Sequence, residues 1–230
     1  GSEFLKYGDT ADHAKHFVLL DDSKDRIYLA QSGVVSGAVP GAFPTHKTPM
    51  TATGPRELKD GADSLQVRFE SADVGGIKLV KTYTVKRGSY AVAVSHALTN
   101  TTGAPIAPQL YLQLVRDGSK PAGESSFYST FTGPAVYTEA KKYQKVEFAA
   151  IKKKSADYEK QSTTGYVAMV QHYFASAWIL PEGMQRTISL DAVEMGAGLA
   201  DCCYRAAMVA PLEAIAPGAT RTIDTTFFVG

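Results

Sequence analysis

The most apolar stretch of the chain is Gly165-Tyr166-Val167-Ala168-Met169-Val170-Gln171-His172-Tyr173-Phe174-Ala175-Ser176-Ala177-Trp178-Ile179-Leu180-Pro181, which contains the only tryptophan. Burying one large side chain stabilises a fold by roughly 1.5–3 kcal/mol, so this stretch can supply a large share of the core energy. Its apolar residues fit a helical stripe and also fit a strand that is buried on both faces. Periodicity alone leaves both interpretations open.

Length and charge limit the classes of protein. The chain has 230 residues, 44% of them hydrophobic, which is enough for one large β domain. Its 24 basic and 23 acidic residues give a formal charge of +1, so no global field favours nucleic acid or an acidic substrate. No stretch reaches the roughly 18 uninterrupted apolar residues that a membrane helix needs. An electrostatic binding site would therefore have to be local.

The first quarter of the sequence is irregular. Residues 1–4 read Gly-Ser-Glu-Phe, which is typical of a cloning scar, and we leave them out of the fold reasoning. Residues 5–16 are polar and predict a ragged terminus. Short strands are expected at 17–20 and 27–31, and the Gly- and Pro-rich stretch 32–63 predicts a long loop or an irregular edge.

A clear alternation begins at residue 64. Leu65, Val67 and Phe69 share one face of a predicted strand. The next strand, 77–85, is apolar on one face except at Lys81. A third strand, 90–99, carries His96 on one face and small residues on the other, so both of its faces are expected to be covered. The three strands predict an antiparallel meander under a second layer.

The remaining sequence predicts more strands and little helix. Strands or short aromatic segments are expected at 106–115, 127–131, 135–138, 186–193, 201–209 and 220–229. A short helix is expected near 139–143 or 156–160. These patterns indicate an all-β protein.

The two cysteines, Cys202 and Cys203, are adjacent. Neighbours on a strand point to opposite faces, so we predict an unbonded pair with one thiol buried. The spacing excludes a CxxC redox motif and a zinc site.

Residues 141–160 form a basic run with seven lysines and three acidic residues, a local charge of about +4. Such a run can be a solvated loop or a frayed helix. It can also attract anionic lipid headgroups or an acidic partner at low salt.

Motifs for catalysis are missing from the sequence. It has no GxSxG, P-loop, GxGxxG or HExxH pattern, and its five histidines lack ligand spacing. His96 and His172 fall in predicted apolar strands, where a hydrogen-bonded core or cleft histidine is the favoured interpretation over a catalytic base.

Three motifs, in the same order, resemble the large periplasmic domain of the YidC family of membrane protein insertases from Gram-negative bacteria. They are the opening stretch, the lysine-arginine-glycine hairpin at Val85-Lys86-Arg87-Gly88-Ser89-Tyr90-Ala91-Val92, and the segment Phe131-Thr132-Gly133-Pro134-Ala135 with Lys141-Lys142-Tyr143-Gln144-Lys145. The resemblance covers about residues 17–230. Three ordered motifs are far more specific than any one of them.

The resemblance implies a fold. It implies a β-supersandwich of two antiparallel sheets, galactose-mutarotase-like, with at most short helices, in which the opening stretch forms one or two buried strands. Residues 5–230 would be a single periplasmic domain. The family's N-terminal strands and C-terminal helix are expected to be absent, which would leave an unpaired sheet edge open to non-native dimerisation.

The resemblance also implies a function. A domain of this family would be non-catalytic and would assist insertion and folding of inner-membrane proteins by docking to the Sec translocon, with its accessory subunit SecF as partner. Nascent inner-membrane proteins would be handled by the full-length protein at the periplasmic face of the inner membrane. No cofactor and no nucleic acid are implied, and this piece alone is expected to be soluble.

Residues 108–158 match the part of the family implicated in contacting SecF. Aromatic and lysine side chains in this part suit a protein interface. The candidate partner-binding residues are Tyr111, Phe127, Tyr128, Phe131, Tyr137, Lys141, Lys142, Tyr143 and Lys145.

Two alternatives follow from the likeness to sugar mutarotases, which use a histidine and a carboxylate. His96 or His172 could act with Glu194 as acid and base. A catalytically silent cleft that binds sugar or peptide is the other alternative. A shared fold does not by itself carry function.

Overall fold

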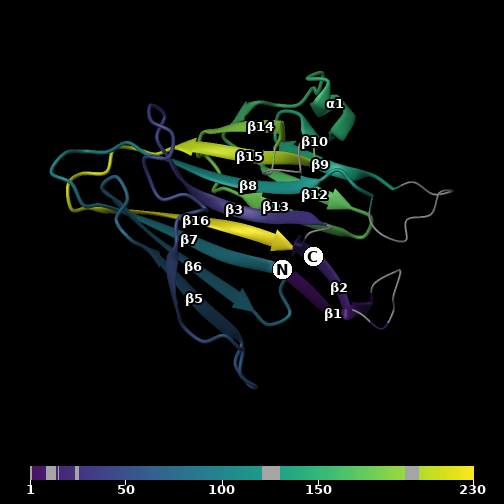
Figure 1. Cartoon of the computed structure of the whole chain (residues 1–230), viewed down its shortest axis with the longest axis horizontal. Coiled ribbons are helices and arrows are strands. Elements are labelled where there is room, and N and C mark those ends of the chain that lie inside the picture. Colours follow the sequence, from purple (N-terminus) through teal and green to yellow (C-terminus); the bar gives the residue numbers. More distant parts are fainter. Residues whose placement is uncertain (1, 9–13, 15, 24–25, 121–129, 195–201) are drawn as a thin grey trace.

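The structure of the chain, a computed structural model, describes all residues except 1, 9–13, 15, 24–25, 121–129 and 195–201. It is built almost entirely from strands (Figure 1). All the strand pairings are antiparallel, and the strands form a seven-stranded and a nine-stranded sheet. The predicted all-β class with two antiparallel sheets is confirmed.

The strand order in each sheet is not the order in the sequence. The seven-stranded sheet runs β1 (Ser2–Gly8), β2 (His16–Asp22), β3 (Ile27–Val35), β8 (Gln109–Asp117), β15 (Cys203–Pro211), β14 (Arg186–Val193) and β11 (Gln161–Ser162). The nine-stranded sheet runs β10 (Lys142–Lys145), β9 (Thr132–Thr138), β12 (Tyr166–Gln171), β13 (Phe174–Ile179), β16 (Thr220–Val229), β7 (Ala91–Asn100), β6 (Ile77–Lys86), β5 (Ser64–Ser71) and β4 (Met50–Thr53). One short helix, α1 (Phe148–Lys152), lies between β10 and β11 in the sequence.

The opening apolar stretch forms two strands, β12 and β13, in the middle of the nine-stranded sheet. Their inner face places Val167, Met169 and Trp178 in the core, while small Ala168 and Ala177 lie on the outer face. The hairpin turns at His172, whose φ of 43° is left-handed. Burial inside the sheet therefore explains why the run reads as nearly continuous apolar sequence.

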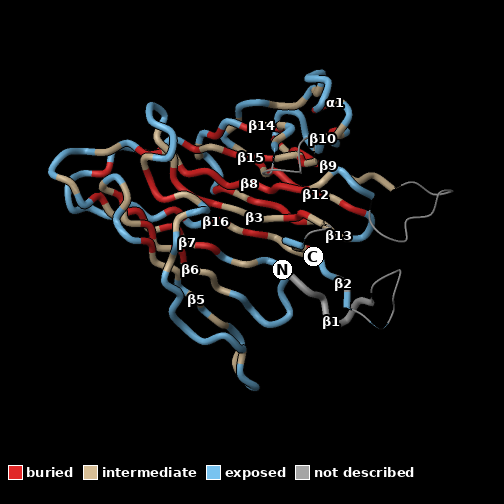
Figure 2. The backbone as a smooth tube through the Cα atoms, viewed as in Figure 1, coloured by how far each residue is buried: buried red, intermediate tan, exposed pale blue. Residues whose placement is uncertain are grey.

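The core lies between the two sheets, where most of the buried backbone is found (Figure 2). Hydrogen bonds cross the core from one sheet to the other. Tyr28 Oη of β3 donates to Met169 O at 2.9 Å, and Trp178 Nε1 of β13 donates to Gln113 O of β8 at 3.2 Å. These bonds fix how one sheet sits on the other, because buried polar groups are rarely left unpaired.

The substitution Trp178→Phe should lower the free energy of unfolding by about 1–3 kcal/mol, because it removes the buried hydrogen bond to Gln113 O and opens a small cavity. Urea unfolding followed by circular dichroism measures this loss. As a control, Tyr173→Ala alters a side chain that is 81% exposed and should change stability by less than about 0.5 kcal/mol. Equal losses in the two variants would contradict the assignment of Trp178 to the core.

The predicted meander is confirmed as β5, β6 and β7. On β7 the face of Val94, His96 and Leu98 is buried, as expected. The prediction that both faces are covered is wrong, because Ala91 and Ala93 on the other face are exposed. Small residues there form an outer sheet surface.

Two predictions about local structure are also wrong, and a third is confirmed in part. The sequence predicts a cloning scar at residues 1–4 and a ragged terminus at residues 5–16, but residues 2–8 form strand β1, which pairs with β2. The cloning origin of residues 1–4 stays a prediction. The helix lies at Phe148–Lys152, because 139–143 is needed for the β9–β10 hairpin and 156–160 is extended beside β14. The stretch 32–63, expected to be a long loop or an irregular edge, contains β4 (Met50–Thr53) at the edge of the nine-stranded sheet, so the second of these alternatives is confirmed in part.

The cysteines also differ from the prediction. Cys202 and Cys203 form a disulfide. The alternation argument needs two strand residues, but β15 begins at Cys203 and Cys202 precedes it. Both side chains pack in a small apolar cluster, and Cys203 is buried as expected.

Candidate partner-binding surface

Six of the predicted partner-binding residues lie together at one edge of the nine-stranded sheet. We call this group the hairpin surface, and it consists of Phe131, Tyr137, Lys141, Lys142, Tyr143 and Lys145. β9 and β10 pair as a hairpin, with Tyr143 opposite Tyr137 and Lys145 opposite Ala135. Strand pairing therefore brings together residues that the sequence only placed near one another.

Aromatic rings line the outer face of the sheet at this surface. The rings of Tyr137 and Tyr166 stack with centroids 5.4 Å apart, and Tyr143 is 46% exposed. Tyr143 and Tyr166 border an apolar cavity of about 220 Å³, whose floor includes Ala168 and Ala177. Burial is the main cause that raises the pKa of the Tyr143 and Tyr166 phenols, so both stay neutral hydrogen-bonding groups.

The lysines of the hairpin surface make different contacts. Lys142 pairs with Glu139, which lowers the pKa of that carboxyl, and Lys141 Nζ lies 3.3 Å from Asp157 Oδ1. Lys145 Nζ lies 5.2 Å from the centre of the Phe131 ring, within the range of a cation–π contact. The surface thus presents apolar rings with cations around them, a combination found in protein interfaces.

The other predicted residues do not join this surface. Tyr111 is buried in β8 of the other sheet, where its ring lies against Gly33 and its Oη accepts a hydrogen bond of 2.8 Å from His46 N. Because only 6% of Tyr111 is exposed, it is not part of the hairpin surface, and its role as a partner contact stays a prediction. Phe127 and Tyr128 lie outside the described residues.

His96 does not form the proposed acid and base pair. Its ring is buried, and Nε2 lies 3.0 Å from Ser32 Oγ. Burial, with a smaller effect of Lys81, lowers the His96 pKa to about 3. Among the described residues no carboxylate hydrogen-bonds to this ring. A base with so low a pKa is poorly matched to neutral pH.

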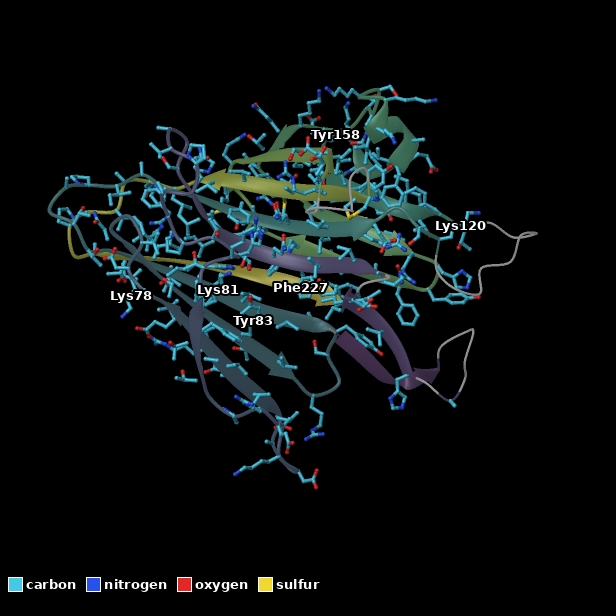
Figure 3. All side chains as sticks on the ribbon, viewed as in Figure 1. Lys78, Lys81, Tyr83, Lys120, Tyr158 and Phe227 are labelled. Atoms are coloured by element: carbon cyan, nitrogen blue, oxygen red, sulfur yellow. A yellow bond between two sulfur atoms is a disulfide. The ribbon has the colours of Figure 1, made fainter. Side chains whose placement is uncertain are left out.

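Lys81, the polar exception on β6, is buried beside His96. Its Nζ donates to Ser32 O of the opposite sheet at 2.6 Å, and burial lowers its pKa to about 8. Figure 3 labels Lys81 and Tyr83 on β6. This polar cluster connects the two sheets.

His172 and Glu194 adjoin strands of different sheets. His172 is exposed in the β12–β13 turn, and its Nδ1 lies 3.0 Å from Thr130 Oγ1. Glu194 follows β14 in the other sheet and is exposed. The prediction that His172 sits within an apolar strand is wrong, because the left-handed turn places it at the tip.

Sequence reasoning missed the outer-face cavity residues Ala168, Ala177 and Phe228. The sequence signal that could have identified them is the alternation of small with large residues in the opening stretch, because a strand face made of small residues leaves room at the sheet surface. It also missed that the basic run divides into two parts. Lys141, Lys142 and Lys145 lie beside the nine-stranded sheet, whereas Lys152, Lys154 and Lys160 surround a cavity next to β14.

Within the described ranges, no group of three or more His, Cys, Asp or Glu residues is placed to hold a metal ion. No described helix is long and apolar enough to cross a membrane. The fold and the hairpin surface define a two-sheet antiparallel β domain whose best candidate site is a surface for another protein. The profile of the family described as YidC periplasmic domain matches residues 1–230, and the chain belongs to this family.

Curated relatives support the family over the whole chain. The chain is 47% identical over 229 residues to the Membrane protein insertase YidC of Bordetella parapertussis and 44% identical to that of Janthinobacterium sp.. These alignments cover 100% and 99% of the chain. The chain spans only 39% and 38% of the relatives' length, so the activity of the whole relatives does not transfer to this chain from the alignment alone.

Solved structures with a similar course of the chain are sugar epimerases and related proteins. A putative aldose 1-epimerase from Escherichia coli K12 is 12% identical, with a TM-score of 0.44 over 79% of this chain and 68% of that one. A galactose mutarotase related enzyme from Lactobacillus acidophilus is 8% identical, with a TM-score of 0.45 over 80% of this chain and 72% of that one. Likeness of this degree carries no argument about activity.

Proposed function

We propose that this chain is a non-catalytic docking domain on the periplasmic face of the bacterial inner membrane. Its partner is SecF, the accessory subunit of the Sec translocon, and the contact assists insertion and folding of inner-membrane proteins. Nascent inner-membrane proteins are handled by the full-length protein. The observation that carries this proposal is the hairpin surface, where the β9–β10 hairpin gathers the exposed Tyr143 and exposed lysines around the half-buried rings of Phe131 and Tyr137.

Two further observations support a docking role. The relatives over the whole chain bear the name of an insertase, although the chain spans less than two fifths of their length. Tyr143 combines a large apolar ring, an exposed fraction of 46% and a position beside an apolar cavity. Tyrosine is enriched among residues that dominate binding energy in interfaces.

A non-catalytic role agrees with the chemistry of the described residues. Burial lowers the pKa of His96 to about 3 and keeps the ring neutral, and among the described residues neither histidine proposed as a base hydrogen-bonds to Glu194. A cleft that binds sugar or peptide stays a prediction.

The test is a titration of the ¹⁵N-labelled chain with the periplasmic region of SecF, following backbone amide shifts. Amide shifts should concentrate in β9, β10 and the segment that follows, and should shrink as salt is raised to about 0.15 M. Tyr143→Ala should weaken binding at least tenfold, about 1.4 kcal/mol, because it removes the exposed ring.

Tyr90→Ala is the matched control, because Tyr90 is 45% exposed and lies in the turn just before β7, outside the hairpin surface. Its affinity should stay within twofold of the unmodified chain. A lack of amide shifts at high SecF concentration, or equal losses in the two variants, would sink the proposal.

A further inference from the structure

A second cavity lies on the opposite side of the basic run, between α1 and β14. Its volume is about 300 Å³, near the lower limit for sites that bind ligands. We call it the α1–β14 cavity, and its floor is formed by Ile151, Ala156 and Leu190. Figure 3 labels Tyr158, which borders it, near the upper margin of the molecule beside α1 and β14. The floor is apolar and can hold one aliphatic or aromatic side chain.

The wall of the cavity is the edge of a sheet. Ile188 N–H donates to Lys160 O at 2.8 Å, and Leu190 N–H donates to Tyr158 Oη at 3.0 Å. Alternate N–H groups of a strand point to the same side, so Ala192 N–H points outward as well. No described residue accepts a hydrogen bond from it. β11 covers only Arg186 and Thr187 of this edge, and Lys160 O and Tyr158 Oη take the next two outward N–H groups. Ala192 N–H is therefore left to donate to the backbone of an incoming segment.

The rim of the cavity is cationic. Lys152, Lys154 and Lys160 surround it, and no described carboxylate forms an ion pair with Lys154 or Lys160. The one acidic residue in the lining, Asp191, already pairs with Arg205, whose Nη2 lies 2.7 Å from Asp191 Oδ2. The rim therefore favours negative charge on whatever fills the floor.

Lys154, on the rim of the cavity, has a strained backbone conformation. Its φ of 55° is left-handed, a conformation that a residue with a Cβ adopts at a cost of about 1 kcal/mol or more. Lys154 N donates to Ile151 O and Ser155 N donates to Ala150 O, bonds that close the end of the helix after its C-cap Lys153. Glycine is the usual residue at such a position, so a lysine here places a charge at the cavity instead of relieving the strain.

We propose that the α1–β14 cavity binds an extended acidic peptide segment of a partner protein, with one apolar side chain on the floor and carboxylates at Lys154 and Lys160. Charge complementarity and the outward sheet edge select this occupant. A flat lipid surface would meet the lysines but would leave the recessed apolar floor unfilled. This inference rests on the proposed docking function, for which it names a second contact and its chemistry.

The experiment titrates the ¹⁵N-labelled chain with the acetylated and amidated peptide Asp-Glu-Phe-Glu-Asp. Two altered peptides test the two features separately. One has Gly in place of Phe and tests the apolar floor, and the other has Asn and Gln in place of Asp and Glu and tests the cationic rim. Amide shifts are expected at 154–160 and 188–192 with the first peptide. Each altered peptide should bind at least fivefold more weakly.

Variants separate binding from folding. The double variant with Lys154→Gly and Lys160→Gln should bind the first peptide at least fivefold more weakly. The thermal unfolding midpoint of Lys154→Gly alone should not fall, because glycine relieves the strain of the left-handed backbone. Lys59→Gln alters an exposed lysine in a distant loop and should bind the peptide unchanged.

The outcomes distinguish this inference from the proposed function. If SecF binds but the acidic peptide does not, or the lysine variants bind the peptide normally, the cavity proposal is overturned and the docking function stands. If the peptide binds as expected and SecF does not, the cavity proposal stands and the docking function fails. Binding that depends on Lys154 and Lys160 but occurs only with phosphatidylglycerol vesicles would overturn the peptide in favour of lipid.

Discussion

Replacing the buried Arg186 by methionine should lower the free energy of unfolding by about 4–6 kcal/mol, a large part of the 5–15 kcal/mol that stabilises a typical domain. Arg186 is fully buried, and its guanidinium donates to backbone oxygens that lie around the loops flanking β12, β13 and β14. The distances run from 2.6 Å to 3.5 Å, and the acceptors are the carbonyls of Thr163, Gly165, Leu180, Pro181 and Met184.

The cost arises because methionine has similar length but no donor. Gly165 and Leu180 are buried, and each of their carbonyls left without the guanidinium costs about 1 kcal/mol or more. The loops that all five carbonyls belong to also lose their common anchor. Arg186→Lys should recover only part of the loss, since an ammonium cannot reproduce the planar fork of five N–H groups.

Urea unfolding of the variants measures this effect, with Arg221→Met as the matched control. Arg221 is 49% exposed and lies 3.5 Å from Glu213, so its loss should cost less than about 0.5 kcal/mol. Equal midpoints for Arg186→Met and Arg221→Met would show that the loops hold without the buried guanidinium.

The second large effect is a loss of stability in acid that depends on His96. The unfolded histidine titrates near 6.5, whereas burial lowers the folded pKa to about 3. The unfolded state therefore binds a proton that the folded state does not, and stability falls as pH decreases from 6.5 toward 3. The difference between the two pKa values corresponds to roughly 5 kcal/mol at about 1.4 kcal/mol per unit of pKa.

The non-titrating variant His96→Gln isolates this contribution. Its amide can still reach Ser32 Oγ, so the protein should fold, but its stability should depend less on pH between 6.5 and 3. Unfolding by urea at a series of pH values measures the slope. Carboxylates elsewhere contribute equally to both proteins, so only the difference between the two curves reports on His96.

Lys81 provides an internal check in a different pH window. Its folded pKa of about 8 lies below its ordinary value of 10.5, so stability should rise as pH increases from about 8 to 10.5. His96→Gln should keep this upper rise. Identical curves for the two proteins below pH 6.5 would contradict the burial of a neutral His96.

Much of the fold follows from local patterns. Strict alternation around Val67 and Phe69 predicted the meander, and the last strand was predicted within its observed bounds, 220–229. The hairpin surface could also be predicted as a segment, because aromatic and lysine residues are dense between 131 and 145. Strand pairing alone decided which of them face the same way, so Tyr137 and Tyr143 came together and Tyr111 was buried elsewhere.

The sequence by itself determined the all-β class and the positions of most strands along the chain, because period-two burial is a property of neighbouring residues, but it did not determine their order within the sheets. It also determined the family, through three motifs in a fixed order. The tertiary structure decided the roles of Lys81, His96 and Arg186, whose partners are set by packing between sheets and loops and not by sequence spacing. It also divided the basic run between two sheet edges, because the chain crosses from one sheet to the other between β10 and β11.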